Sequence, residues 1–235
     1  MVSIDDRLQQ IRQRIASACR QSGRSSQTVS LLAVSKTVDV ALLRQAFDAG
    51  QRAFGENYVQ EALDKIAALA DVRAALQWHL IGPLQSNKTR AVAEHFDWVH
   101  SVDRLKVAQR LCEQRPAGMA PLNVCLQVNI SHEPSKSGVL PAEVPALATA
   151  VAALPRERIV LRGLMAIPEP VGDVAAQRAP HRALRELFEA LCAQGLALDT
   201  LSMGMSADLE AAVMEGTTMV RIGTALFGQR GAQAP

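Results

Sequence analysis

The side chain with the clearest chemical potential in this sequence is the amine of Lys36. It follows residues 31–35, a run of apolar and small residues typical of a buried strand, and a helical pattern begins near Asp39. An unpaired ammonium is costly to bury, so a lysine at the end of such a strand either finds a partner or lowers its pKa. A neutral lysine amine is the nucleophile that forms a Schiff base with a carbonyl compound. The alternative is that Lys36 points into solvent from a loop, and the rest of the chain decides between the two.

A second set of residues, near the end of the chain, is suited to binding an anion. Ser206 stands where a helical pattern begins, and we expect it to be the helix N-cap. Gly223 and Thr224 provide an uncrowded backbone and a hydroxyl on the last expected strand. Free backbone N–H groups and a helix dipole favour a dianion such as phosphate. Each residue alone also has an ordinary structural explanation, because Ser206 could simply cap its helix and Gly223 could simply allow close packing.

The two sets lie far apart in the sequence, so the fold must bring them together. Isoleucine and leucine recur at helical spacing over residues 4–15, which predicts an amphipathic helix over residues 3–23. Strand patterns then alternate with helical patterns along the rest of the chain. The expected strands are residues 30–35, 52–56, 77–82, 98–102, 123–130, 159–167, 201–205 and 219–227.

This alternation predicts a parallel sheet whose strands are joined by helical crossovers. The first strand is not followed by a glycine-rich GxGxxG turn, which weakens the doubly wound, dinucleotide-binding version of such a sheet. Eight strands within 235 residues favour the closed alternative, an α/β fold of the (β/α)8 TIM barrel type. We therefore expect residues 1–235 to form a single barrel domain, with residues 1–23 as a leading helix packed on the barrel.

In a TIM barrel the active site lies at the carboxyl ends of the strands, and phosphate is often bound by the loops after strands seven and eight. Lys36, Ser206, Gly223 and Thr224 all belong to this mouth in the expected fold. The other residues expected around it are Asn57, Tyr58, His79, Lys136, Met203, Gly204 and Arg221. A carbonyl-reactive lysine beside a phosphate cup indicates a phosphorylated aldehyde held as a Schiff base, and pyridoxal 5'-phosphate (PLP) is such a compound.

Two further basic residues of the mouth have open roles. Arg221, on the last expected strand, would face either the phosphate or the pyridine nitrogen of PLP. At the nitrogen, a permanent cation would keep that atom unprotonated and make the ring a poor electron sink. Lys136, after the fifth expected strand, either contacts the cofactor in transit or is an exposed loop lysine. Of the remaining lysines, we expect Lys65 and Lys106 to be solvated on amphipathic helices and Lys88 to lie on the surface.

Composition and residue spacing exclude several other functions. A net charge of +2 and an aromatic content of 3% argue against nucleic-acid binding, and no apolar run is long enough to cross a membrane. The acidic start of the chain does not fit a signal peptide, and the four cysteines form no CxxC pair, so we expect a cytoplasmic protein with reduced cysteines. The five histidines show no metal-binding spacing, so we expect no metal site.

Ordered segments along essentially the whole chain resemble the pyridoxal phosphate homeostasis proteins, the YggS/PROSC family. They are AVSKT (33–37), FGENYVQE (54–61), WHLIGPLQSNK (78–88), VNIS (128–131), SKSG (135–138), GLMAI (163–167), LSMGMSADLEAAV (201–213) and VRIGTALFG (220–228). The resemblance implies a barrel like the N-terminal domain of alanine racemase, with PLP held as a Schiff base on Lys36. The residues that it places around the phosphate or the ring are Ser206, Arg221, Gly223 and Thr224, with Asn57 nearby.

The function that the resemblance implies is intracellular PLP (vitamin B6) homeostasis, in which the protein buffers or delivers the cofactor without an established catalytic turnover. Apo-enzymes that depend on PLP would then be its partners, and the protein would be a monomer or a weak dimer.

Two departures from related proteins bear on this interpretation. Many relatives carry a second lysine two residues after the Schiff-base lysine, where this chain has Val38. Alanine racemase has an additional β domain that supplies a tyrosine base, whereas this chain has a single tyrosine, Tyr58. An amino-acid racemase that uses PLP is the main alternative, and it would need Tyr58 or Lys136 as its second base. A Schiff-base aldolase with a sugar phosphate in the cup is a third alternative on the same barrel.

Overall fold

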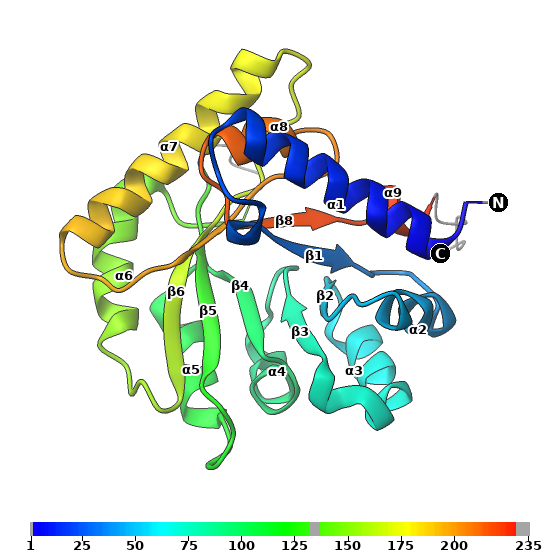
Figure 1. Ribbon diagram of the computed structural model, residues 1–235. Helices are drawn as coiled ribbons and strands as arrows, with labels where there is room; N and C mark the ends of the chain where they lie inside the picture. Colours follow the sequence, from blue (N-terminus) through cyan, green and yellow to red (C-terminus); the bar gives the residue numbers. More distant parts are fainter. Residues whose placement is uncertain (1, 132–136, 229–235) are drawn as a thin grey trace.

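Parallel strands close into an eight-stranded barrel in the computed structural model, which describes residues 2–131 and 137–228 (Figure 1). The strands are β1 (Ser30–Val34), β2 (Ala53–Glu56), β3 (Gln77–Leu80), β4 (Trp98–Val102), β5 (Leu122–Gln127), β6 (Ile159–Met165), β7 (Thr200–Ser202) and β8 (Met219–Ile222). Each strand pairs with its neighbours in the sequence, and β1 pairs with β8 to complete the cylinder. The predicted TIM barrel is therefore confirmed, although several strands are shorter than the patterns suggested.

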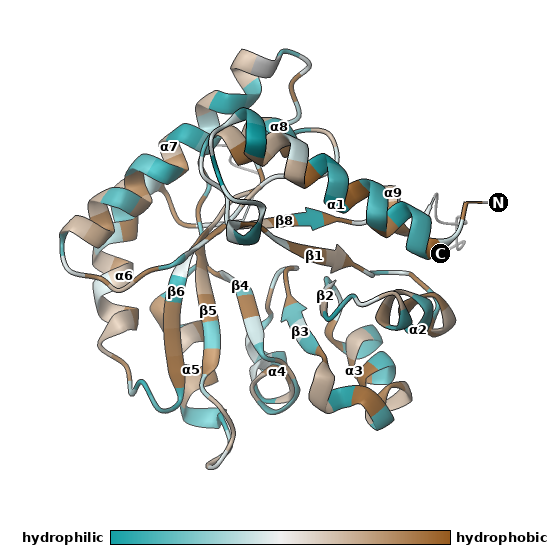
Figure 2. Ribbon diagram, in the orientation of Figure 1, coloured by the Kyte–Doolittle hydropathy of each residue, from teal (hydrophilic) through white to brown (hydrophobic). Residues whose placement is uncertain are grey.

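Helices cover the outside of the barrel (Figure 1). They are α1 (Ile4–Gln21), α2 (Val40–Asp48), α3 (Val59–Ala68), α4 (Thr89–His95), α5 (Leu105–Gln114), α6 (Val144–Ala152), α7 (Val174–Ala193), α8 (Leu209–Met214) and α9 (Thr224–Phe227). Short 3-10 turns are η1 (Ser26–Thr28), η2 (Ala70–Ala75), η3 (Ser86–Lys88) and η4 (Pro141–Glu143). Helices α1 and α7 carry many hydrophilic residues, whereas β5 and β6 are largely hydrophobic (Figure 2). None of the helices in the described ranges is long and apolar enough to cross a membrane.

The leading helix α1 covers the side of the barrel where β8 closes onto β1 (Figure 1). Ser3 and Asp6 fix its start, because their side chains and backbone N–H groups form a capping box. The apolar residues of α1 are buried, and the helix contacts α2, α8 and α9. Arg14 adds an ion pair with Glu210 of α8, with 2.5 Å between Nε and Oε1. Helix α1 thus supports the two helices that follow the last two strands.

The end of the barrel differs from the strand expected over 219–227. Strand β8 stops at Ile222, and the next residues form the one-turn helix α9 with Gly223 at its N-cap. The ladder to β1 ends at Ile222. Leu226 and Phe227 are buried, and α9 packs against α1. The last apolar residues of the region are therefore buried by a helix and not by a longer strand.

Helix α8 also begins later than expected, at Leu209 instead of Ala207. Its N-cap is Asp208, and Ser206 lies in the preceding turn. Asp208 Oδ1 accepts the backbone N–H of Met205 at 2.7 Å, and this bond closes the turn before the helix starts. The prediction that Ser206 caps the helix is therefore wrong.

A network of hydrogen-bonded polar side chains crosses the interior of the barrel. His79 Nδ1 lies 3.0 Å from His100 Nε2, and His100 Nδ1 lies 2.9 Å from Ser202 Oγ. Ser202 Oγ also accepts a hydrogen bond from Arg221 Nη1 at 2.9 Å. The two histidines belong to β3 and β4, whereas Ser202 and Arg221 belong to β7 and β8, so these contacts run across the cylinder. Barrel interiors are usually filled by branched apolar side chains, and this barrel departs from that pattern.

His79 and His100, the two histidines of this polar network, are held neutral. Both rings lie against Trp98, which forms a small buried cluster with Cys125 and Met165. The ring of His79 stacks on Trp98 with 5.3 Å between ring centroids, and burial lowers the pKa of His79 to about 3. Burial also lowers the pKa of His100 well below its usual value, with smaller contributions from the nearby His79 and Arg221. Both rings are therefore uncharged at neutral pH.

We predict that this histidine pair makes the fold sensitive to acid. The unfolded chain binds a proton at each histidine below about pH 6.5, whereas the folded barrel does not, so the free energy of unfolding falls as the pH drops from about 6 to 4. Each histidine contributes a slope of about 1.4 kcal/mol per pH unit in this window. Denaturant unfolding of His100→Gln at several pH values should show a slope smaller by about that amount. The exposed His95→Gln is the control and should keep the wild-type slope, and an unchanged slope in His100→Gln would contradict the prediction.

We also predict that Gly163 is required for the pairing of β6 with β7. Gly163 pairs with Thr200, and a Cβ at position 163 would overlap the Thr200 carbonyl oxygen. Gly163→Ala should therefore push the two strands apart and lower the free energy of unfolding by about 3 kcal/mol or more. Gly172→Ala is the matched control, because nothing lies near that Cβ, and its effect should stay within about 0.5 kcal/mol. Equal midpoints of thermal unfolding for the two variants would be the contrary result.

Candidate functional site

A cavity of about 470 Å³ opens at the carboxyl ends of the strands. Its polar wall is formed by Lys36, Asn57, Ser206, Arg221, Gly223 and Thr224. Its apolar wall is formed by Val34, Ile81, Ile167, Met205 and Ala207. The structure thus brings together all six residues that the sequence predicted for cofactor binding. Among the described residues that line the cavity, none is acidic.

The barrel topology explains why these residues meet. Lys36 follows β1 by two positions, Asn57 directly follows β2, and Arg221 lies within β8. Ser206 belongs to the loop between β7 and α8, and Thr224 is the first residue of α9. Because parallel strands all end at the same rim, the segments that follow them surround one opening.

The backbone around Lys36 is tightly constrained. Ser35 N–H donates to the Gly55 carbonyl at 2.9 Å, which extends the contact between β1 and β2 by one residue. Val38 N–H donates back to the Ser35 carbonyl at 3.0 Å, so the chain turns directly at Lys36. Thr37 has a φ of 57°, in the left-handed region that β-branched residues rarely adopt. The half-buried Lys36 is therefore presented to the cavity by a short and strained turn.

Lys65 lies beneath this turn, and the expectation that it is solvated is wrong. Its side chain is only 5% exposed, and its ammonium donates to the Ser35 carbonyl at 2.6 Å. It also forms ion pairs with Glu56 at 2.9 Å and with Glu61 at 2.5 Å. Burial raises the pKa of Glu56, although the neighbouring Lys65 acts in the opposite direction. The helical pattern of α3 identified a buried face, but it could not show that the β1 loop and β2 supply acceptors for a cation on that face.

Arg221 places a fixed cation on the inner wall of the cavity. It is 3% exposed, and it donates through Nη1 to the carbonyl and hydroxyl oxygens of Ser202 and through Nη2 to the Ala166 carbonyl. Burial lowers its pKa to about 10, while Asp208 acts to raise it, so the guanidinium is charged at neutral pH. An arginine has five N–H donors, and among the described residues acceptors are found for three of them, which leaves donors for a ligand.

The turn that carries Ser206 is anchored from below by Asp208. Besides the Met205 N–H, Asp208 contacts His181 of α7, with 2.9 Å between Oδ2 and Nε2. Burial acts to raise the pKa of Asp208, but the hydrogen bonds from His181 and Met205 outweigh it, and the pKa is lowered. The carboxylate therefore stays ionised and keeps the turn in place. Ser206 and Ala207 face the cavity from this fixed turn.

The start of helix α9 forms the neighbouring part of the wall. Gly223 is its N-cap, and the carbonyl of Gly223 accepts the N–H groups of Leu226 and Phe227. The first N–H groups of any helix have no acceptor within the helix and point along its axis. Gly223 and Thr224 therefore contribute backbone donors as well as the Thr224 hydroxyl. Sequence periodicity could not reveal this helix, because one turn is shorter than the repeat that periodicity requires.

Four of the five accessory residues proposed from sequence are described by the structure, and these four do not line this cavity. Tyr58 is 58% exposed at the start of α3, and His79 is buried inside the barrel. Met203 is buried in the main hydrophobic core, and a Cβ at Gly204 would overlap Ala212, so this glycine serves the packing of α8. Lys136 lies outside the described residues.

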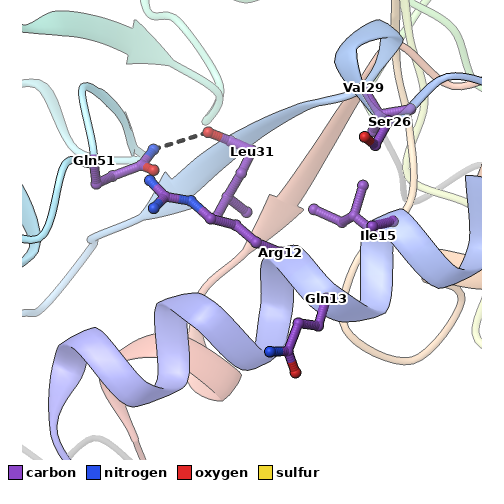
Figure 3. Close-up of a pocket in the computed structure, with 8 residues that line it drawn as sticks. Arg12, Gln13, Ile15, Ser26, Val29, Leu31 and Gln51 are labelled. Carbon is purple, nitrogen blue, oxygen red and sulfur yellow. Dashed lines mark hydrogen bonds between the residues drawn. The ribbon is translucent and has the colours of Figure 1, made fainter.

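Two other cavities help to define the site. A smaller one of about 280 Å³ shares Asn57, Ile81 and Ile167 with the main cavity and extends it toward Asn129. Another, of about 470 Å³, lies between α1, η1 and β1 (Figure 3). There Gln51 donates to the Leu31 carbonyl at 2.8 Å, and no lysine is found among the described lining residues. In this barrel fold, function is associated with the carboxyl end of the strands, so the cavity at Lys36 is the candidate site.

Comparison with known proteins agrees with this geometry. The sequence model of the protein family "alanine racemase, N-terminal domain" matches residues 7–231 of this chain. The chain is 62% identical over 235 residues to the pyridoxal phosphate homeostasis protein of Pseudomonas aeruginosa, with 100% of this chain and 99% of the relative covered. It is 54% identical over 231 residues to the protein of the same name from Escherichia coli strain K12, with 98% of each chain covered.

A solved structure extends the comparison to three dimensions. PipY from Synechococcus elongatus PCC7942, in its structure with PLP bound, superposes with a TM-score of 0.84 at 40% identity, covering 96% of this chain and 100% of PipY. Identity of this extent over whole chains establishes common family membership. This chain therefore belongs to the family of pyridoxal phosphate homeostasis proteins, built on the alanine racemase N-terminal domain.

Proposed function

We propose that this chain binds PLP at the barrel mouth, as a Schiff base on Lys36, and takes part in intracellular PLP homeostasis. The observation that carries the proposal is the convergence on one cavity of a lysine amine, a buried guanidinium and neutral hydrogen-bond donors. The names of the curated relatives and the PLP-bound structure of PipY support the same function.

The polar wall of the cavity fits the parts of this cofactor. PLP supplies an aldehyde when it is bound, and Lys36 is the primary amine on the described cavity wall. The hydroxyls of Ser206 and Thr224 and the first N–H groups of α9 are suited to a phosphate dianion. Since the described lining holds no carboxylate, the wall does not repel that charge.

We assign Arg221 to the ring nitrogen of PLP and the loop donors to its phosphate. Arg221 lies within β8 and is fixed to Ser202 and Ala166, whereas the donors at Ser206 and Thr224 lie beyond the strand ends. A fixed cation beside the ring nitrogen opposes its protonation. The ring then withdraws electrons weakly, which favours holding the cofactor over carbanion chemistry on it.

The arrangement also favours a carrier over the racemase alternative. A racemase must protonate both faces of a carbanion, which requires two acid/base groups. Among the lining residues in the described part of the chain, Lys36 is the one side chain suited to act as a base. Tyr58, the single tyrosine, is largely exposed and lies outside the lining. We therefore propose buffering or delivery of PLP, with PLP-dependent apo-enzymes as recipients.

We predict that Lys36→Ala abolishes the covalent attachment of PLP. The wild-type protein titrated with PLP should develop the visible absorbance of a Schiff base, and borohydride should fix the label on Lys36 in a peptide map. Lys36→Ala should lack this absorbance and the label, because it lacks the nucleophilic amine. Lys106→Ala, which removes an exposed lysine of α5, is the control and should behave like the wild type. A label on another lysine of the wild-type protein would refute the assignment.

A second prediction concerns turnover. The PLP-loaded protein incubated in deuterium oxide with a panel of amino acids that includes alanine and serine should introduce no deuterium at the α-carbon. The reason is the cation assigned to the ring nitrogen, which disfavours the carbanion that this exchange requires. NMR or mass spectrometry of the amino acids measures the exchange, with an alanine racemase as the positive control. Catalytic exchange with inversion at the α-carbon that disappears in Lys36→Ala would establish the racemase alternative.

A further inference from the structure

A buried ionic cluster lies directly below the turn that carries Lys36. Lys65 of α3 is its cation, and Glu56 of β2 and Glu61 of α3 are its anions. The Lys65 ammonium has three N–H donors, and it has three acceptors, namely the Ser35 carbonyl at 2.6 Å, Glu56 Oε1 at 2.9 Å and Glu61 Oε1 at 2.5 Å. The cation is therefore fully satisfied by groups that belong to three separate segments.

This cluster holds the chain on both sides of Lys36. The carbonyl that Lys65 binds belongs to the peptide group between Ser35 and Lys36. Glu61 Oε1 accepts the N–H of Thr37 at 2.5 Å, and that N–H belongs to the peptide group between Lys36 and Thr37. The orientations of these two peptide groups define φ and ψ of Lys36, and with them the direction of its Cα–Cβ bond. The cluster thus sets where the Lys36 side chain points.

The turn requires such support, because its conformation is unfavourable by itself. Thr37 has a φ of 57°, and a β-branched residue in this region persists only where its surroundings impose it. Glu56 adds a third anchor, since its Oε1 accepts the hydroxyl of Ser35 at 2.6 Å. Without these bonds, the residues around position 37 would relax toward a negative φ, and Lys36 would lose its fixed direction.

The cluster also distinguishes two lysines that belong to the same turn region, because Lys65 binds the carbonyl of the residue before Lys36. An ammonium whose three protons are all bound has no lone pair to attack an aldehyde, so Lys65 does not compete with Lys36. Removal of Lys65 would leave the buried Glu56 and the neighbouring Glu61 without their cation, and would release the Ser35 carbonyl.

We propose that Lys65 is a positioning residue for Schiff-base formation: it acts with Glu61 and Glu56 to orient Lys36 toward the cofactor without contacting the cofactor. This inference rests on the proposed function of PLP binding at Lys36. It adds a role for three residues outside the cavity wall, and it separates the reactive lysine from its structural neighbour.

The test compares Lys65→Met with Arg115→Met in the full-length protein. Arg115 is a matched control, because it is a buried cation whose guanidinium binds the backbone carbonyls of Ala93, Phe96 and Ala120, apart from the residues of the cavity wall. Circular dichroism melts report the loss of stability in each variant. Stopped-flow absorbance reports the rate of Schiff-base formation with PLP, and hydrogen exchange of the cofactor-free protein reports the protection of the Thr37 amide.

We expect Lys65→Met to form the Schiff base about 10-fold more slowly than the wild type, which corresponds to about 1.4 kcal/mol. The Thr37 amide should also exchange faster in the absence of PLP. Arg115→Met should lower the melting temperature but leave both quantities at their wild-type values. The inference is overturned if folded Lys65→Met reacts at the wild-type rate with a protected Thr37 amide, or if Arg115→Met shows the same slowing.

A second pair of variants keeps the test decisive if Lys65→Met does not fold. Glu61 is partly exposed, so Glu61→Ala should fold, and it removes the acceptor of the Thr37 N–H. Glu61→Gln retains an oxygen acceptor and should restore most of the reaction rate and the amide protection that Glu61→Ala loses. Equal rates for the alanine and glutamine variants would overturn the positioning role. A wild-type protein that forms no Schiff base at all would refute the proposed function itself, which is a separate outcome visible in the same titration.

Discussion

The site depends on the pairing of the first strand of the barrel with the last. Residues 30–33 of β1 run parallel to residues 219–222 of β8, with Leu32 opposite Arg221 and Ala33 opposite Ile222. Because the two strands are parallel and in register, the chain leaves both of them at the same rim. Lys36 and Gly223, almost 190 positions apart in the sequence, thereby face one cavity. No local interaction could achieve this, so the amine and the segment proposed to bind the anion come together only when the cylinder is closed.

The interior of the barrel determines the second feature of the site, its fixed positive charge. A buried arginine carries a large desolvation cost unless its donors are satisfied. Here the Ser202 hydroxyl and two backbone carbonyls supply acceptors, and the neutral pair of His79 and His100 extends the polar network across the cylinder. Branched apolar residues would fill the same space at lower cost. These polar groups instead hold Arg221 in one position, where its positive charge faces a ligand bound in the cavity.

The sequence could predict those parts of the structure that follow from periodicity and from strand order. The alternation of strands and helices gave the barrel, and the barrel placed Lys36, Asn57, Ser206 and Thr224 at one mouth. Three features followed from contacts that no local pattern encodes. Asp208 closes a turn and displaces the helix start from Ser206, the apolar residues after Ile222 are buried by a single helical turn, and Lys65 finds its acceptors on other segments. The spacing of Glu61 and Lys65 four residues apart was a signal of pairing, but such pairs are usually on the surface.

The two lysines near the mouth show how the environment decides the chemistry of identical side chains. Lys65 lies among carboxylates and a carbonyl that bind each of its protons, so it serves as a structural cation. Lys36 lies on a wall whose described members include a guanidinium and hydroxyls but no acid. A carrier of the proposed kind needs this asymmetry, because the reversible covalent bond must form at one amine while the anchoring charges stay constant. The same barrel therefore presents one lysine to the cavity and uses the other as a structural cation.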